Sequence, residues 1–460
     1  MVARPFPFPK SSTPGARPNE GEGRYMNCYP ITEGQRSYVR RLPGLERVAS
    51  TGQSGIRGMI DVSGIVYVVW AGSVTAVIGS GVVTLSGSIP GTDGVTLTRN
   101  NKVTSGVSDP DIVAVREGGG AYIITVTAVS AYPDADLPTT ANSVDFLGGY
   151  FLFTIPDGRI FASELNSTDI NALSFTTAEN RSDGLRRIVV QGNLAYAMGG
   201  STIEPYQNVG TSPFPLQRAA TVLPSGALTT MGVAGFEEGW SQALYFVASD
   251  NTTRALSGYT DTIVSTPDVD RFVSASTTST LRLMCYTYNG RPFLAMSSDA
   301  GTWELDVSSG AWHERTSVGT SPARWRASCS VYSNDRWLFG DVLTGDILRL
   351  STALLENGSA FGGFIQSGQL QDFPARIATA MAANFTAADM TIYVSWSRDG
   401  GTTYSTEIPR SIAHAEKYAT RVASLGLSTS IGFIIRLRWE GAVDFSFSGA
   451  TAESIKARAA

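Results

Sequence analysis

The chain has 460 residues, of which 48 are glycine and 21 are proline, and its formal net charge is −5 at pH 7. So many residues that interrupt regular structure argue against a long helical bundle, and the acidic balance argues against a protein that holds nucleic acid through clustered cations. Hydrophobic residues make up 42% of the chain and charged residues 16%, so the sequence can bury a large core and lacks the composition of a disordered polymer.

Residues 1–50 are predicted to form an extended arm. Proline lacks an amide donor and is excluded from helix interiors and central strands, and this stretch contains Pro5, Pro7, Pro9, Pro14, Pro18, Pro30 and Pro43. The stretch also carries the aromatic and arginine residues that are enriched at protein interfaces. We therefore predict that the arm lies on a partner through an interface of Phe6, Phe8, Tyr25, Tyr29, Tyr38, Arg40 and Arg41.

A repeated strand pattern begins near residue 56. Each repeat has an apolar or alternating strand, a turn rich in Gly, Asp or Asn, a second apolar strand, another turn and a third strand. Six or seven passages fit, and their first turns are predicted at Gly64, Gly119, Gly149, Gly192, Gly239, Gly290 and Asp335. Their average spacing of about 45 residues is that of four-stranded propeller blades. The sequence thus predicts an all-β protein with a β-propeller of six or seven irregular blades over residues 51–355, although a solenoid or a stack of sandwiches would give a similar spacing.

A second domain is predicted over residues 356–460, after a Gly- and Ser-containing break at residues 352–363. In the strand around Ile392 and Val394, apolar side chains alternate with polar ones such as Ser395. Strands with this period of two, separated by turn residues, indicate a small C-terminal β-sandwich that is packed on one face.

Few residues suggest catalysis or metal binding. The only histidines, His313 and His414, lie in no H-E-x-x-H motif, and Cys28, Cys285 and Cys329 have no C-x-x-C spacing. We therefore predict a protein that is not an enzyme and has no catalytic residue, metal or cofactor. No apolar run approaches the ~20 residues of a membrane-spanning helix, so no membrane segment is expected.

One turn motif is recognisable near the C-terminus. Ser397, Asp399, Gly401 and Tyr404 match the S-x-D-x-G-x-x-aromatic turn called the Asp box, which occurs between strands in sialidase-like propellers. Its aspartate caps backbone amides and its glycine takes positive φ, so we predict a structural turn. A second passage, residues 297–303, nearly matches. These turns leave open a glycan-binding or sialidase-like propeller, in which Trp240, Trp303 and Trp325 would stack on sugars.

Several motifs resemble one protein family. They lie at residues 27–30, 41–47, 200–206, 397–404 and 432–438. The chain is similar in these places to the tail nozzle or hub proteins of short-tailed phages, also called packaged-DNA stabilisation or head-completion proteins. The similarity is diffuse and spans most of the chain.

The resemblance implies a structural component of the virion tail, made in the host cytoplasm. It implies a hexamer ring below the portal-adaptor (head-tail connector) proteins, which closes the head after packaging, retains DNA and supports a tail needle, tailspike or fibre. DNA would pass through the lumen without sequence-specific binding, and an acidic subunit is compatible with a conduit that does not grip phosphate. From this we expect a monomer or weak oligomer that forms rings only on its adaptor, and a β fold that survives deletion of residues 1–48.

Overall fold

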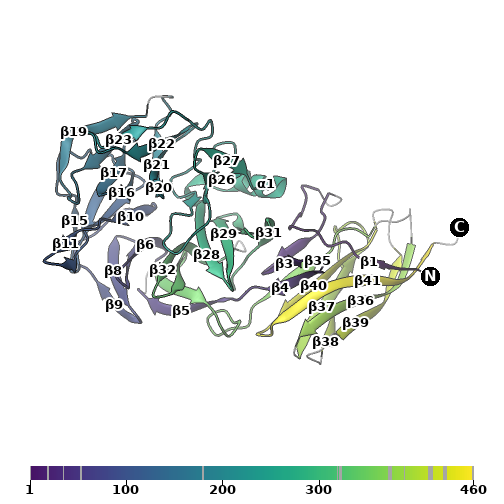
Figure 1. The fold of residues 1–460 in the computed structure, drawn as a ribbon. Coiled ribbons are helices and arrows are strands. Elements are labelled where there is room, and N and C mark those ends of the chain that lie inside the picture. The colour runs from purple at the N-terminus through teal and green to yellow at the C-terminus, as the bar shows by residue number, and fades with distance from the viewer. Residues whose placement is uncertain are drawn as a thin grey trace. The chain divides into compact units, whose positions relative to one another are not determined.

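The computed structural model describes residues 2–17, 20–34, 36–51, 54–178, 181–318, 320, 324–370, 376–387, 389–412, 418–427 and 432–457. Strands dominate these residues (Figure 1), and the described part contains one α-helix, α1 (Pro267–Ala275), and one 3-10 turn, η1 (Thr278–Thr280). Contacts group the chain into two compact units. Unit 1 comprises Met1–Glu46, Gly301–Trp325 and Leu350–Ala460, and unit 2 comprises Arg47–Ala300 and Arg326–Arg349.

Unit 2 contains five four-stranded antiparallel sheets that follow one another along the chain. Their strands in order are β6 (Ile56–Val62), β7 (Ile65–Trp70), β8 (Ser73–Ile78) and β9 (Gly81–Thr84); β10 (Val95–Arg99), β13 (Ile112–Arg116), β14 (Ala121–Ile124) and β15 (Val129–Ala131); β16 (Ser143–Leu147), β17 (Tyr150–Thr154), β18 (Arg159–Ser163) and β19 (Ile170–Thr177); β20 (Leu185–Gln191), β21 (Leu194–Gly199), β22 (Ile203–Asn208) and β23 (Leu216–Arg218); and β24 (Val233–Ala234), β25 (Leu244–Val247), β26 (Thr253–Ser257) and β27 (Thr260–Ile263).

Further strands complete unit 2. They are the hairpin of β11 (Val103–Thr104) and β12 (Val107–Ser108), the antiparallel pair β28 (Arg282–Tyr288) and β29 (Arg291–Ser298), and the sheet of β32 (Ala327–Ser333), β33 (Arg336–Asp341), β34 (Asp346–Leu350) and β5 (Leu45–Ser50). Two-residue turns with positive φ at both positions join several first and second strands, as at Asn289-Gly290 and Asn334-Asp335. This turn matches the twist of a hairpin, and Asn and Gly adopt it at low steric cost.

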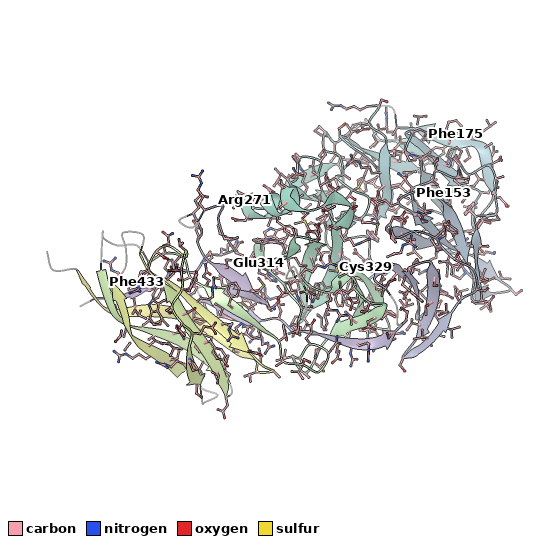
Figure 2. The ribbon with its side chains drawn as sticks, turned by 180° about the vertical axis from the view of Figure 1, so that it is seen from behind. Phe153, Phe175, Arg271, Glu314, Cys329 and Phe433 are labelled. Carbon is pink, nitrogen blue, oxygen red and sulfur yellow. The ribbon has the colours of Figure 1, made fainter. Side chains whose placement is uncertain are left out.

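The sheets of unit 2 are buried on both faces. In β13, Ile112 and Ala114 join a hydrophobic cluster with the first sheet, whereas Val113 and Val115 join a cluster with the third sheet. Successive strand residues point to opposite faces, so each sheet packs between its two neighbours. Figure 2 labels Phe153, which is fully buried in β17, and Phe175 in the outer strand β19, which is 36% exposed.

The series of sheets returns to its beginning. The first strands of most consecutive sheets contact one another, and β32 of the last sheet contacts β6 of the first. Ala49 of β5 lies in one hydrophobic cluster with Val331, Ile347, Val66 and Val68. Strands from both ends of unit 2 therefore share one sheet, which fastens the end of the unit to its start.

Unit 1 contains two sheets. One has the strand order β3 (Cys28–Glu33), β4 (Arg36–Arg41), β41 (Phe445–Ala457), β36 (Arg376–Ala387) and β39 (Tyr418–Leu427), with β1 (Val2–Pro5) also paired to β41. The other includes, in order, β30 (Gly301–Asp306), β31 (Ala311–Glu314), β2 (Arg24–Met26), β35 (Gly362–Gln366), β40 (Ile434–Glu440), β37 (Met390–Ser397) and β38 (Ile408–Ile412).

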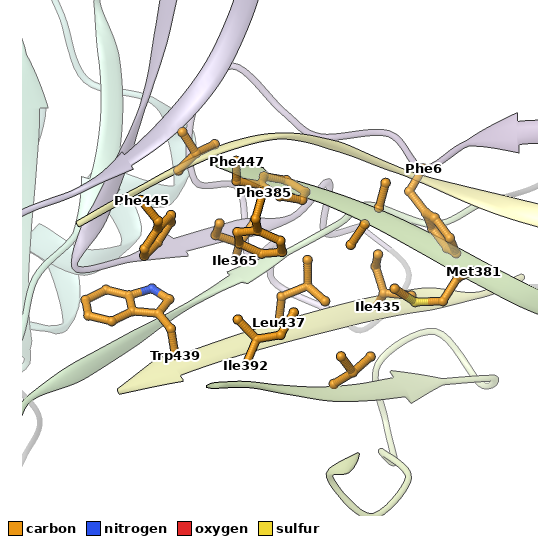
Figure 3. Close-up of a cluster of buried hydrophobic side chains, with 14 of the residues drawn as sticks. Phe6, Ile365, Met381, Phe385, Ile392, Ile435, Leu437, Trp439, Phe445 and Phe447 are labelled. Atoms are coloured by element: carbon orange, nitrogen blue, oxygen red, sulfur yellow. The ribbon is translucent and has the colours of Figure 1, made fainter. Parts of the chain in front are cut away.

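Side chains from both sheets of unit 1 form one hydrophobic cluster, shown in Figure 3. Phe385 of β36 and Phe447 of β41 come from the first sheet, and Ile392 and Leu437 come from the second. Apolar residues alternate with polar ones along β37 and β40, as the sequence indicated for this region.

The two units divide the chain differently from the predicted segments 1–50, 51–355 and 356–460. Residues 1–46 and 301–325 group with the C-terminal part of the chain. The prolines permit this, because Pro30 lies in the edge strand β3 and Pro5 ends β1, where a missing amide donor is tolerated. Residues 1–46 are thus built into the sheets of unit 1.

Candidate functional site

A cavity of about 290 Å³ opens in unit 2 where the later residues of its first strands meet. The first strands β6, β10, β16, β20 and β32 supply lining residues, and the segment after β24 supplies three more. The lining consists of Met59, Ile60, Asp61, Leu97, Thr98, Arg99, Asn101, Asp145, Phe146, Val190, Phe236, Glu237, Glu238, Ser330, Val331 and Tyr332.

The carboxylates of this cavity bind backbone amides of neighbouring sheets. Asp145 accepts hydrogen bonds from the amide of Phe146 at 2.8 Å and from the amide of Val190, in the next sheet, at 2.7 Å. Glu237 accepts from the amides of Gly235 at 2.6 Å and Cys285 at 3.1 Å. Burial raises the pKa of Asp145 to about 6 and also raises the pKa of Glu237. These acids thus connect adjacent first strands.

Sequence reasoning did not single out two charged residues of these first strands, Asp145 and Arg187. Asp145 stands between the apolar Val144 and Phe146 in a strand, and Arg187 stands in the apolar strand β20. The sequence did contain a signal for them, because a charged residue inside an otherwise apolar strand needs a buried partner.

Four of the predicted interface residues are buried inside unit 1. Phe6 is 4% exposed in the hydrophobic cluster, and Tyr25 is 1% exposed and donates its hydroxyl to the carbonyl of Pro9 at 2.7 Å. Tyr29 is 3% exposed and its ring lies 5.9 Å from that of His313. These side chains, like Arg41, are covered by their own chain.

Arg41 is 3% exposed and donates hydrogen bonds to three backbone carbonyls. Nη1 bonds the carbonyls of Gly441 and Val443, both at 2.7 Å, and Nη2 bonds that of Leu354 at 2.9 Å. The guanidinium also lies 4.4 Å from the ring centroid of Trp439. It holds together loops that are far apart in sequence.

The other three predicted interface residues are more accessible. Phe8 is half-buried, with its ring edge-on to that of Phe447 at 5.0 Å. Tyr38 is half-buried and Arg40 is exposed, with the Arg40 guanidinium 5.7 Å from the centre of the Tyr38 ring. An interface on this part of unit 1 would therefore use Phe8, Tyr38 and Arg40.

The turn at residues 397–404 has the geometry of a structural turn. Asp399 accepts hydrogen bonds from the Ser397 hydroxyl at 2.7 Å and from the amide and hydroxyl of Thr403 at 2.9 and 2.6 Å. The hydrogen bonds that Thr403 and Ser397 donate lower the pKa of Asp399 to about 2. Gly401 has φ +93°, and the half-buried Tyr404 ring stacks under the Arg436 guanidinium at 4.0 Å. At the near-match, Asp299 instead accepts from Thr277 and Thr280.

The remaining candidates are the histidines and the cysteines. His313 is fully buried, with Nε2 2.7 Å from Glu304, whereas His414 lies outside the described residues. Burial raises the pKa of all three cysteine thiols, which keeps them protonated at neutral pH. Among the described residues, no group of three or more His, Cys, Asp or Glu could hold a metal ion, and no helix there is long and apolar enough to cross a membrane.

The tryptophans give the glycan-binding alternative no support. Trp303 is 6% exposed and Trp325 is 1% exposed, with the Arg315 guanidinium 3.9 Å from the Trp325 ring. Trp240 is half-buried and its indole nitrogen donates to the carbonyl of Ala243 at 3.0 Å. Trp303 and Trp325 cannot present a face to a sugar.

Comparison with curated proteins found no match. The similar structures include the computationally designed Ika8 protein, BBS1N in complex with ARL6DN, and the mitotic checkpoint complex. The Ika8 structure is 12% identical, covers 66% of this chain and 100% of its own, and has a TM-score of 0.41. The BBS1N structure is 11% identical, covers 68% of this chain and 97% of its own, and has a TM-score of 0.44. The mitotic checkpoint structure is 12% identical, covers 67% of this chain and 94% of its own, and has a TM-score of 0.42. At these TM-scores they carry no argument about this protein.

A family match is decisive. The model of the phage stabilisation family, described as bacteriophage P22 Gp10, beta-propeller, matches residues 26–354, a span that includes all of unit 2. The all-β and propeller predictions and the phage resemblance are thereby confirmed. The chain belongs to the phage stabilisation family of bacteriophage P22 Gp10 and is a structural tail protein of a phage virion, of the kind that stabilises packaged DNA.

Proposed function

We propose that this chain is a tail nozzle subunit. Six copies form a ring below the portal-adaptor proteins, close the channel after packaging, retain the DNA and support a tail needle, tailspike or fibre. The observation that carries this proposal is the family match over residues 26–354. The nozzle position and the six-fold ring rest on the family resemblance.

The proposed architecture is a seven-bladed propeller with a β-sandwich. Five four-stranded sheets, the pair β28 and β29, and the sheet of β32, β33, β34 and β5 support a count of seven blades in unit 2. The common hydrophobic cluster of the two unit 1 sheets supports a sandwich. Sheets that are buried on both faces are stiff because packed interiors have low compressibility, which suits a part that must hold against internal pressure.

DNA is proposed to pass through the lumen of the ring of subunits, outside the axis of any one propeller. The axial cavity of about 290 Å³ is far too small for a duplex whose major groove alone is about 12 Å wide. The net charge of −5 supports a surface that does not hold phosphate by counterion release. The proposed mechanism thus involves contact and closure, and it assigns no covalent chemistry to the chain.

The test is DNA retention. Phage heads assembled without this protein should package DNA and then lose it to an added nuclease, and purified chain added after packaging should restore protection. Chain that has been heat-unfolded before addition is the control and should not protect. Heads that keep their DNA equally well with and without the protein would refute the proposal.

A further inference from the structure

A second, smaller cavity adjoins the axial cavity of unit 2. Its volume is about 50 Å³, and Met59, Leu97, Phe236, Glu237 and Ser330 line both cavities. The smaller cavity lies nearer the starts of the first strands, where Arg187 of β20, Arg282 of β28 and Cys329 of β32, labelled in Figure 2, complete the wall. A solute that enters the larger cavity would therefore have a short path to the smaller one.

Arg187 and Arg282 line this small cavity, and each has one buried guanidinium nitrogen without a hydrogen-bond partner among the described residues. Arg187 is 5% exposed, and its Nη1 donates to the carbonyl of Thr230 at 2.8 Å. Its Nε, and Nη1 of Arg282, are buried and donate to no atom of the residues that the structure describes. A guanidinium stays charged inside proteins. The cavity wall therefore carries two positive charges beside the carboxyl group of Glu237.

The carboxylates around these arginines are already engaged. Glu237, the carboxylate that lines the small cavity, uses both oxygens for the backbone amides of Gly235 and Cys285. Asp93 is bound by Arg57 at 3.2 Å and Arg116 at 3.0 Å. Within the described part of the chain, neither Arg187 nor Arg282 has a carboxylate at ion-pair distance.

The more distant carboxylates are engaged too. Glu117 attracts both arginines electrostatically. Its carboxylate also accepts a hydrogen bond from the Thr229 hydroxyl at 3.3 Å. Asp145 also acts on Arg187, and its oxygens hold backbone amides. Burial lowers the pKa of both Arg187 and Arg282, as expected where little in the surroundings solvates a positive charge.

We propose that the small cavity binds a monatomic anion of chloride size between Arg187 and Arg282. A buried charge requires a partner, and a cavity volume of about 50 Å³ exceeds the ~10–15 Å³ that one water-sized occupant needs. The hydroxyls of Thr96 and Ser328 also line the cavity and can complete the ion's coordination.

Bromide gives a direct test, because it replaces chloride and scatters anomalously. Crystals of the full chain grown in sodium bromide should show an anomalous peak at hydrogen-bond distance from the Arg187 and Arg282 guanidinium groups. A cavity that contains only water, with bromide confined to the surface, would overturn the proposal.

Thermal unfolding gives a second test in solution. A ligand that binds the folded state alone raises Tm as its concentration rises, so Tm of the wild-type chain should increase more in sodium chloride than in sodium gluconate of equal ionic strength. Arg282→Gln, which removes no described protein hydrogen bond, should lose this difference. Arg159→Gln, at a half-buried arginine paired with Asp157 elsewhere in unit 2, should keep it. Equal halide responses in wild type and Arg282→Gln would count against the site, and if that variant does not fold, the bromide map decides.

Discussion

Buried arginines in this protein bind mainly backbone carbonyl oxygens. Arg41 bonds three carbonyls in unit 1, and Arg57 bonds those of Ala71, Ile89 and Asp93 in unit 2. A planar fork of five donors can satisfy several loop carbonyls at once, which a lysine ammonium cannot do in the same geometry. This use within the chain gives the arginines a structural role that composition alone does not reveal.

Replacing Arg41 by lysine should destabilise unit 1 by roughly 2–4 kcal/mol, because buried carbonyls lose their donors while a buried charge remains. The free energy of unfolding, measured by urea denaturation, checks this. Arg40→Lys is the matched control: Arg40 is the neighbouring residue and is exposed, so the change should stay within about 0.5 kcal/mol. Equal losses in the two variants would contradict the assignment of Arg41 to the core.

The axial acid Asp145 should make unit 2 more stable at mildly acidic pH. Burial raises its pKa in the folded state to about 6, above the ~3.9 of an unfolded chain. The folded state therefore binds more protons between these values, and the contribution of this group to stability falls as pH rises from about 4 to about 6.

Asp145→Asn should remove that part of the pH dependence, which is on the order of 3 kcal/mol. Urea unfolding at several pH values would measure it. Asp157→Asn is the opposite control, because hydrogen bonding by Arg159 lowers the pKa of Asp157, so its contribution is lost as pH falls. A wild-type pH profile retained in Asp145→Asn would show that other groups cause the dependence.

At the scale of elements, the sequence predicted local hairpins well and long-range pairing poorly. Gly64, Gly192 and Gly290 lie between the first and second strands of their sheets, as predicted. Gly119 does not, because the hairpin of β11 and β12 lengthens the first connection of that sheet and moves Gly119 to the next turn. Turn chemistry is encoded locally, whereas an insertion alters only the spacing between repeats.

The strand β2 shows what local patterns could not predict. It lies between β31 and β35 within a sheet, although it comes from the proline-rich segment that predicted an arm. Its burial arises from partners about 290 and 340 residues away in the chain, and no period or turn signal in the first residues encodes them. The charged residues Asp145 and Arg187 likewise meet their partners only when strands from different sheets come together.

Deletion of residues 1–46 should therefore unfold unit 1. The deletion removes β2 from the interior of a sheet, takes Phe6 and Tyr25 from the core, and leaves β31 and β35 without a shared neighbour. Deletion of residues 1–5 removes only β1 and is the milder control. Circular dichroism and limited proteolysis would follow both, with unit 2 expected to remain protected. If the longer deletion leaves the β-sheet circular dichroism equal to that of the full-length chain and unit 1 still protected from proteolysis, the result would support the arm that the sequence predicted.

At the scale of the whole molecule, the assembly state remains a prediction. We expect the purified chain to be a monomer or weak oligomer, because specific assembly here requires surfaces supplied by the portal-adaptor ring. Light scattering coupled to size exclusion would measure the mass, and negative-stain images with cognate portal-adaptor complexes would show rings. A stable hexamer of the isolated chain would contradict the template-dependent step.

Unit 1 is assembled from the beginning, the middle and the end of the chain. During translation its first strands leave the ribosome hundreds of residues before β36 and β41 exist, and those strands supply much of the shared core. Unit 2 can complete its folding while synthesis of the chain continues, but unit 1 cannot. A product truncated near its C-terminus should carry a folded unit 2 and an incomplete unit 1, and we expect only complete polypeptides to enter the particle.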